Sequence, residues 1–299
     1  MILVTGCAGY IGSRLAEGLL KDGMQVRGMI LPDERENVKH LVKLGLKVWE
    51  GDLLKPETLD GVGEDISMIY HLAGGHFSSI KKMEELYIEG TRRLLENFVE
   101  CGIKACVIAS NGAVYGDCGD EIIKENREPR PTHPFGDITL KMEQQVMKYH
   151  KQNGFPGIIL RIAEVYGPAQ YNFLKSGSPQ NTILLGDGTN FNSRIHIKDV
   201  LNVLRLAPFK LAAGQAYNVT DDQPVRQVDF YTKLAEITGS APPRWISLDN
   251  MDHRIKLSIH GLRALSLRMS GEKIKKALDY ELIFPTYKEG IKFLSVLNE

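Results

Sequence analysis

The sequence predicts an α/β protein built on a doubly wound parallel sheet, and three observations lead to that fold class. Apolar runs of strand length alternate with segments of helical periodicity along the first half of the chain. The runs are apolar throughout, which is typical of strands that are covered by helices on both faces. A glycine-rich loop joins the first run to the first helical segment.

The elements follow from the spacing of apolar residues. Helical spacing over 13–21, for example, places Leu15 and Leu19 on one face. The expected helices are 13–21, 84–101 and 140–152. The expected strands are 2–4, 26–31, 48–50, 68–72, 105–109 and 157–162.

The pattern changes after residue 168. Residues 172–192 are rich in Gly, Ser, Asn and Pro, which favours loops and short elements that could line a pocket. The C-terminal part is too irregular for a second unit of the same kind. We therefore expect a sheet domain over 1–165 and a smaller C-terminal lobe over 166–299, partly interleaved with the sheet.

Composition excludes several classes of protein. Lys plus Arg and Asp plus Glu both total 37, so no overall charge favours nucleic acid or a membrane surface. No run of 18 apolar residues and no signal-peptide pattern is visible, so we expect a cytoplasmic protein without membrane contact. Of the cysteines, Cys101 and Cys106 lack partners at zinc spacing, and we expect reduced thiols and no metal site.

The glycine loop has the spacing G-x-x-G-x-x-G between a strand and a helix. Gly6 suits a tight turn, Gly9 allows close approach of a pyrophosphate, and Gly12 allows helix-to-strand packing. The helix N-terminus supplies N–H groups and partial positive charge to phosphates. These features predict a Rossmann dinucleotide site. The expected contacts are Gly6, Ala8, Gly9, Tyr10, Ile11 and Gly12.

Two further stretches fit the same ligand. Asp52 and Leu53 follow the third strand, where a carboxylate can accept a hydrogen bond from an adenine amino group. A loop or helix-capping carboxylate is the alternative for Asp52. Small residues follow the fourth strand, as a backbone that passes close to a cofactor requires. The expected contacts there are Leu72, Ala73 and Gly74.

With these motifs the chain resembles the NAD-dependent epimerase/dehydratase family, the extended short-chain dehydrogenases. The matching stretches are 5–12, 51–53, 71–74, 114–116, 165–168, 186–188, 194–200 and 217–219. The resemblance implies a seven-stranded sheet, NAD or NADP, and a small-molecule substrate such as a nucleotide sugar in the C-terminal lobe. It also implies a homodimer through the helices expected at 84–101 and 140–152.

The family holds the dinucleotide ribose with an acidic or basic residue just after the second strand. Here Ile30 and Leu31 stand at those positions, and neither can recognise a 2′-hydroxyl or a 2′-phosphate. Asp33, Glu34 and Arg35 follow and would act in opposite directions. We favour NAD over NADP.

The family's chemistry depends on a Ser or Thr and on a Y-x-x-x-K pair. The flanking motifs place Asn111, Phe135 and Thr139 at these positions. A phenyl ring exchanges no proton and threonine carries no charge, whereas Asn111 still hydrogen-bonds a substrate oxygen. General acid–base catalysis contributes about a hundred- to ten-thousand-fold, so ordinary alcohol–ketone hydride transfer should be lost here.

Other side chains near the expected pocket could replace the missing groups. The catalytic candidates are Asn111, Asp137 and Tyr115, although Tyr115 is also expected to be packed. Tyr171 and Lys175 form a literal Y-x-x-x-K, but they lie in an expected loop.

Substrate contacts are expected from both parts of the chain. Arg194 would face a phosphate or carboxylate, where an arginine fork binds in two places. The alternative is a salt bridge to Asp187 or Asp199. The expected substrate-binding residues are Asn111, Phe135, Tyr166, Asn172 and Arg194.

Two functions stay open on the sequence alone. One is an NAD(P)-dependent epimerase, dehydratase or oxidoreductase with a non-standard acid/base set. The other is a catalytically silent protein that senses a dinucleotide or serves as a structural subunit. The substrate itself, the direction of reaction and the acid/base residue are not specified by the sequence.

Overall fold

A computed structural model describes residues 1–75, 79–168, 183–247 and 259–296. It contains a seven-stranded sheet with strand order β12-β7-β5-β4-β1-β2-β3, and the pairs joining β5 to β3 are parallel. The doubly wound α/β fold predicted from the sequence is confirmed. The strands are β1 Ile2–Thr5, β2 Val26–Ile30, β3 Lys47–Glu50, β4 Met68–His71, β5 Ala105–Asn111, β7 Gly157–Ile162 and β12 Gln215–Val219.

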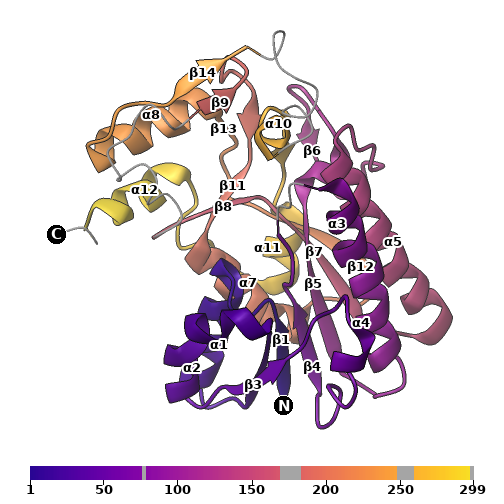
Figure 1. Ribbon diagram of the computed structural model, residues 1–299. Helices are drawn as coiled ribbons and strands as arrows, with labels where there is room; N and C mark the ends of the chain where they lie inside the picture. The colour runs from indigo at the N-terminus through magenta and orange to yellow at the C-terminus, as the bar shows by residue number, and fades with distance from the viewer. Residues whose placement is uncertain (76–78, 169–182, 248–258, 297–299) are drawn as a thin grey trace. The chain divides into compact units, whose positions relative to one another are not determined.

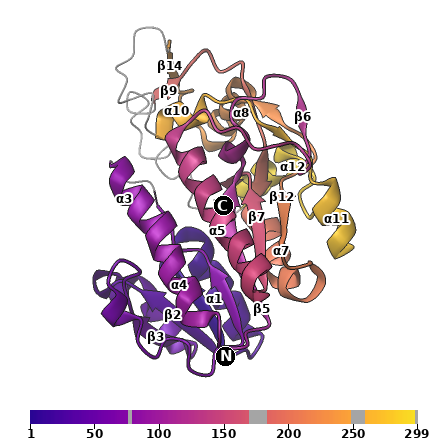
Figure 2. The same cartoon turned by 90° about the vertical axis from the view of Figure 1, so that its right-hand side faces the viewer.

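Helices lie on both faces of this sheet. Figure 1 shows α1 (Tyr10–Lys21) and α2 (Lys39–Lys43) on one face and α4 (Thr91–Phe98) and α5 (Pro134–Asn153) on the other, and Figure 2 agrees. The apolar faces of α4 and α5 meet buried strand residues in one core. Its helical members are Leu94, Leu95, Phe98, Met142 and Val146.

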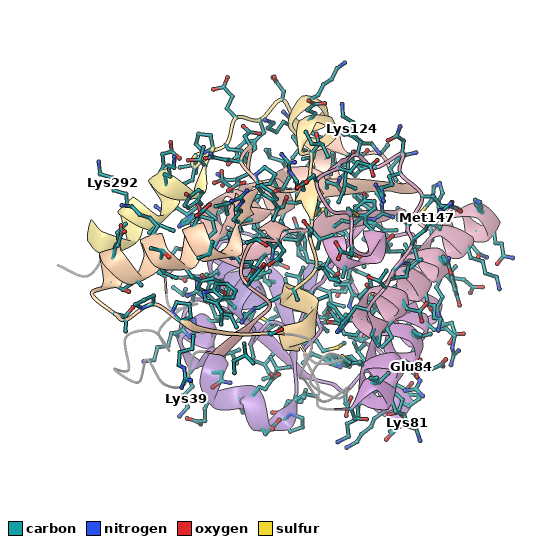
Figure 3. The ribbon with its side chains drawn as sticks, turned by 90° about the horizontal axis from the view of Figure 1, so that it is seen from above. Lys39, Lys81, Glu84, Lys124, Met147 and Lys292 are labelled. Atoms are coloured by element: carbon teal, nitrogen blue, oxygen red, sulfur yellow. The ribbon has the colours of Figure 1, made fainter. Side chains whose placement is uncertain are left out.

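The helix expected over 84–101 begins earlier, at Ile80, ends earlier, at Phe98, and is interrupted. It begins as α3 (Ile80–Glu84), passes through a π-helical turn, η3 (Glu85–Gly90), and continues as α4. Lys81 and Glu84 of α3 point outward (Figure 3). The π segment is only six residues long, and the apolar positions of 84–101 did not reveal it.

The helix expected at 140–152 begins earlier, at Pro134. Proline is favoured at the first position of a helix, where its missing N–H has no intrahelical partner. Phe135, Asp137 and Thr139 therefore lie on α5 and not in a loop before it.

The chain divides into two compact units, each made of three segments. Unit 1 contains Met1–Ser110, Ile138–Leu160 and Leu201–Ala216. Unit 2 contains Asn111–Asp137, Arg161–Val200 and Tyr217–Glu299. Several elements cross the division, among them β5, β7, α5 and α7 (Ile197–Lys210). The domain boundary after residue 165 stays a prediction.

Unit 2 consists of short elements around a core that α8 and α12 share (Figure 1). Aromatic side chains dominate this core, including Tyr166, Phe230 and Tyr231. No helix in the described part of the chain is long and apolar enough to cross a membrane. The short strands are β6 Ile122–Ile123, β8 Glu164–Tyr166, β9 Ile183–Leu185, β10 Phe191–Asn192, β11 Arg194–His196, β13 Val225–Arg226, β14 Arg244–Ile246 and β15 Arg268–Met269. The helices are η4 Gly112–Tyr115, α8 Gln227–Thr238, α10 Ile259–Arg263, α11 Glu272–Leu278 and α12 Tyr287–Val296.

The substitution Gly12→Ala tests the packing of α1 on the glycine loop. A Cβ on Gly12 would lie 2.2 Å from the carbonyl oxygen of Gly6. We expect a loss of about 1–3 kcal/mol of unfolding free energy, measured by urea denaturation. Gly18→Ala on the same helix is the control, because its Cβ meets nothing closer than Arg205 at 3.9 Å. That variant should be neutral or more stable. Equal stability of the two variants would contradict the packing role of Gly12.

Candidate functional site

The hydroxyl of Thr5, at the end of β1, organises the loops after β1 and β4. Its oxygen accepts hydrogen bonds from the backbone N–H groups of Leu72 and Ala73, at 3.2 and 3.1 Å. It also lies 2.8 Å from Nδ1 of His71. Since both lone pairs of the hydroxyl are used, its proton must be donated to Nδ1.

This arrangement assigns the tautomer of His71. Nδ1 is the acceptor, so Nε2 carries the proton and donates to Oγ1 of Thr91 at 3.0 Å. A second proton on Nδ1 would face a hydroxyl that has no acceptor capacity left. The ring is buried, and desolvation lowers the pKa of His71 to about 4. The histidine is therefore a neutral connector between three elements.

The glycine loop closes against the same segment. Gly6 has a φ of +65°, and a Cβ there would lie 2.7 Å from the carbonyl oxygen of Leu72. Both the left-handed backbone and the close approach require glycine. The turn expected at Gly6 and the packing expected at Gly12 are thus present in the structure.

Gly9 is the N-cap residue of α1, and no side chain caps this helix. The backbone of Gly9 is extended, and a Cβ would meet only Gly6 O within 4 Å, at 3.2 Å. Cys7 and Gly12 are buried, whereas Ala8, Gly9 and Ile11 are at least partly exposed. The loop therefore presents bare backbone and the positive end of a 12-residue helix to the outside. Such a cradle fits a pyrophosphate.

The structure places Asp52 and Leu53 after β3. A carboxylate oxygen of Asp52 accepts a hydrogen bond from Leu54 N at 2.9 Å, which is the loop role that the sequence left open. Leu53 is buried in the core, and its carbonyl accepts a hydrogen bond from Arg93 Nη1. Contact of either residue with adenine stays a prediction.

The π turn delivers Tyr87 to the segment after β4. Gly75 N donates a hydrogen bond to the Tyr87 hydroxyl at 3.1 Å. A Cβ on Gly74 would lie 2.5 Å from that hydroxyl oxygen, so Gly74 has to be glycine for Tyr87 to fit. Burial raises the pKa of Tyr87, and the bond from Gly75 opposes the shift. Sequence reasoning noted Ala73 and Gly74 but missed Tyr87 as their support, because only the π turn brings it there.

The positions of the family's catalytic residues lie at the end of β5 and on α5. Asn111 ends β5, and its side-chain oxygen accepts a hydrogen bond from Ala113 N at 2.9 Å, which caps η4. Phe135 is only 7% exposed and Thr139 is fully buried. Asp137 lies between them in the first turn of α5 and is partly exposed. Two of the three positions are thus occupied by buried side chains that carry no charge.

Tyr115 is a buried connector. Its hydroxyl donates to Oδ1 of Asn218 and accepts from Nη1 of Arg161, both at 2.8 Å. The guanidinium of Arg161 also lies 4.8 Å from the centre of the tyrosine ring. Desolvation raises the pKa of Tyr115, with a smaller opposing effect from Arg161. These contacts favour the packed interpretation of Tyr115, and its catalytic role stays an untested prediction.

Arg194 is fully buried and ion-paired. Its Nη1 lies 2.9 Å from a carboxylate oxygen of Glu164, and its guanidinium carbon lies 3.5 Å from the centre of the Phe230 ring. The salt bridge foreseen as an alternative therefore exists, but its partner is neither Asp187 nor Asp199. The register of β8 and β11 places Arg194 opposite Glu164, and this pairing of distant segments is invisible in the sequence.

The other candidates have separate outcomes. Tyr166 is fully buried, with its hydroxyl 3.5 Å from the carbonyl oxygen of Thr286, so substrate contact would require its neighbours to move. Asn172, Tyr171 and Lys175 lie outside the described residues. Among the residues that the structure describes, no group of His, Cys, Asp or Glu side chains could hold a metal ion.

Comparison with known proteins agrees with this architecture. The model of the NAD dependent epimerase/dehydratase family matches residues 2–220. The chain belongs to this family of Rossmann-fold proteins.

Two curated relatives match most of this chain. An uncharacterized UDP-glucose epimerase of Bacillus subtilis is 31% identical, over 80% of this chain and 82% of its own length. The dTDP-D-glucose 4,6-dehydratase of Dictyostelium discoideum is 28% identical over 79% of this chain. The chain spans only 62% of the length of that relative.

Solved structures share the fold. The dTDP-glucose 4,6-dehydratase of Bacillus anthracis, in complex with NAD, superposes with a TM-score of 0.83 at 22% identity and covers 99% of this chain and 95% of its own. The UDP-glucose 4-epimerase of Thermotoga maritima, with UDP-glucose, gives the same score and identity over 99% of this chain and 97% of its own. At this identity the likeness establishes the fold alone.

Replacement of His71 should change the acid sensitivity of the protein. The folded-state pKa of about 4 lies below the ordinary value of 6.5, so the unfolded state binds more protons between these values. Stability is therefore present above pH 6.5 and is lost as the pH falls toward 4, at up to about 1.4 kcal/mol per pH unit. When urea denaturation is repeated at several pH values, the unfolding free energy of His71→Gln should fall less steeply between pH 6.5 and pH 4 than that of the wild type.

His196 adds a similar slope, because burial also lowers its pKa to about 4. His196 is present in both the wild type and His71→Gln, so its contribution cancels when the two proteins are compared. The exposed His40 on α2 gives the control, His40→Gln, which should keep the wild-type slope. An unchanged slope in His71→Gln would argue against a neutral, buried His71.

Proposed function

We propose that this protein binds NAD on the Gly6–Gly12 loop. The observation that supports this most directly is the bare cradle itself: a left-handed Gly6, a helix N-terminus at Gly9 without a side-chain cap, and a Gly12 whose Cβ would lie 2.2 Å from Gly6 O. The cradle would hold the pyrophosphate, and the backbone after β4, fixed by Thr5, would lie along the dinucleotide. Bound NAD would supply hydride-transfer capacity.

The proposed substrate class is a nucleotide sugar or a related small molecule. Relatives named for UDP-glucose and dTDP-glucose support this class. Neither Phe135 nor Thr139 can take a proton from a substrate hydroxyl. We assign proton transfer to a non-standard set in which Asp137 is the titratable member and Asn111 orients a substrate oxygen.

A catalytically silent dinucleotide-binding protein is the second candidate, and one observation favours it. Phe135 and Thr139, which the sequence aligns with the family's tyrosine and lysine, are nearly or fully buried. Side chains of this kind contribute to packing rather than to chemistry. The two candidates share NAD binding and differ only in turnover.

We also propose a cytoplasmic homodimer, with helices α3, α4 and α5 as the paired surface. The support is family analogy together with the outward-facing side chains of α3 (Figure 3).

NAD binding is tested by Gly9→Val. The extended backbone of Gly9 is open to L-residues, and a Cβ would lie 3.2 Å from Gly6 O, so the fold should persist with a modest loss of stability while the side chain blocks the pyrophosphate. We expect NAD affinity to fall by about tenfold or more in isothermal titration calorimetry, with only a small decrease in the urea midpoint. Gly18→Ala, farther along α1, should bind NAD as the wild type does. Equal NAD affinity in Gly9→Val would remove the basis of the proposed site.

Turnover distinguishes the two candidate functions. Purified protein with NAD would be offered a panel of UDP- and dTDP-hexoses, with products followed by NMR. If it is an enzyme, Asp137→Asn should reduce turnover by about a hundredfold or more. The control is Asp120→Asn, at an exposed position elsewhere in unit 2. NAD binding without product from any substrate would support the silent protein instead.

A further inference from the structure

The carboxylate of Glu34 is fixed at the carboxyl end of β2. The strand ends at Ile30, and a 3₁₀ helix, η1 (Pro32–Val38), begins directly after Leu31. Within its first turn Glu34 reaches back, and Oε2 accepts a hydrogen bond from Leu31 N at 2.9 Å. The turn also closes through Glu34 N, which donates to the Leu31 carbonyl oxygen at 3.0 Å. The carboxylate is therefore held by the backbone, although Glu34 lies several residues beyond the strand.

This carboxylate lies beside the glycine loop. Strands β1 and β2 are parallel neighbours with Thr5 opposite Met29, so their carboxyl ends meet. Cys7 N donates to the Met29 carbonyl oxygen at 3.3 Å, which ties the loop to the end of β2. The charge of Glu34 reaches Cys7: burial first, and then Glu34, raise the pKa of this thiol to about 12.

The neighbouring cation is directed elsewhere. Arg35 forms an ion pair with Glu50, the last residue of β3, which lies opposite Ile30 in the sheet. Of the charged side chains in this turn, Glu34 is thus the one bonded to the end of β2, while the positive charge of Arg35 is matched by a carboxylate.

In doubly wound sheets, a carboxylate near the end of the second strand accepts a hydrogen bond from the 2′-hydroxyl of an adenine ribose. The same carboxylate repels a 2′-phosphate, which carries negative charge and has no proton to offer at neutral pH. Ile30 and Leu31 stand where the family usually has this carboxylate. Neither can bond the 2′-hydroxyl or repel a 2′-phosphate, since Ile30 is buried and Leu31 is apolar.

We propose that Glu34 is the residue that selects NAD over NADP, with the 3₁₀ turn substituting for an acid at the strand end. The inference rests on the proposed dinucleotide site and assigns its ribose subsite. In the sequence, the acids Asp33 and Glu34 favour NAD and the base Arg35 favours NADP. Of these three, Glu34 is the one whose side chain is hydrogen-bonded to Leu31 at the strand end.

The decisive variant is Glu34→Gln, because a glutamine oxygen can still accept the bond from Leu31 N while the charge is removed. Calorimetric titration with NAD and with NADP gives both affinities without any turnover. We expect the wild type to prefer NAD by about tenfold or more, and the variant to lose most of that preference. NAD should bind more weakly and NADP more tightly, with an unchanged urea midpoint.

Two further variants complete the test. Glu36→Gln removes a carboxylate from the same turn whose partner is the exposed Lys39, labelled in Figure 3, and should leave the NAD/NADP ratio unchanged. Arg35→Ala should not lower NADP affinity by more than about twofold, because the Arg35 side chain is paired with Glu50 and not with the end of β2.

The outcomes separate the two proposals. A wild type that binds NAD but keeps its NAD/NADP ratio in Glu34→Gln overturns the role of Glu34 and leaves the dinucleotide site intact. A wild type that prefers NADP, and loses that preference in Arg35→Ala, assigns the subsite to Arg35 instead. Absence of binding to both dinucleotides overturns the proposed function, and the role of Glu34 with it.

Discussion

The hydroxyl of Thr5 is the contact on which the candidate site depends. It accepts the N–H groups of Leu72 and Ala73 and donates to His71, which continues the chain to Thr91. One side chain thereby joins the ends of β1 and β4 to the helical layer. All the groups are buried or partly buried, so each lost bond would leave a desolvated polar atom at a cost of about 1–3 kcal/mol. The network holds the backbone after β4 close to Gly6, which explains why that glycine admits no Cβ.

The same physical rule applies in unit 2, where buried polar side chains are held by one another. Tyr115 is held between Asn218 and Arg161, and Arg194 is paired with Glu164 and stacked on Phe230. Removing one partner from such a buried pair leaves an uncompensated charge, which is strongly destabilising. Several residues that appear chemically promising in the sequence are therefore bound to one another.

The residues of this chain differ from those expected for the family's chemistry on α5. The glycine loop presents bare backbone at the N-terminus of α1, whereas Phe135 and Thr139, which the sequence aligns with the family's tyrosine and lysine, are nearly or fully buried and carry no charge. The fold therefore supports binding more strongly than it supports catalysis. The place of Glu34 departs from the family's usual position: a short 3₁₀ turn brings its carboxylate back to the end of β2, where Ile30 and Leu31 are apolar.

The sequence alone determined the parallel α/β sheet and the position of the glycine loop, and it predicts the loss of the family's tyrosine and lysine. These features depend on local periodicity and on residue identity at fixed spacing, so Gly6, Phe135 and Thr139 reveal them directly. It did not determine the π turn that carries Tyr87, the early start of α5 or the Arg194–Glu164 pair. The fixed place of Glu34 was likewise beyond it. Each of these required contacts between backbone and side chains that only the folded chain brings together, since hydrogen-bond partners distant in sequence leave no periodic signal along the chain.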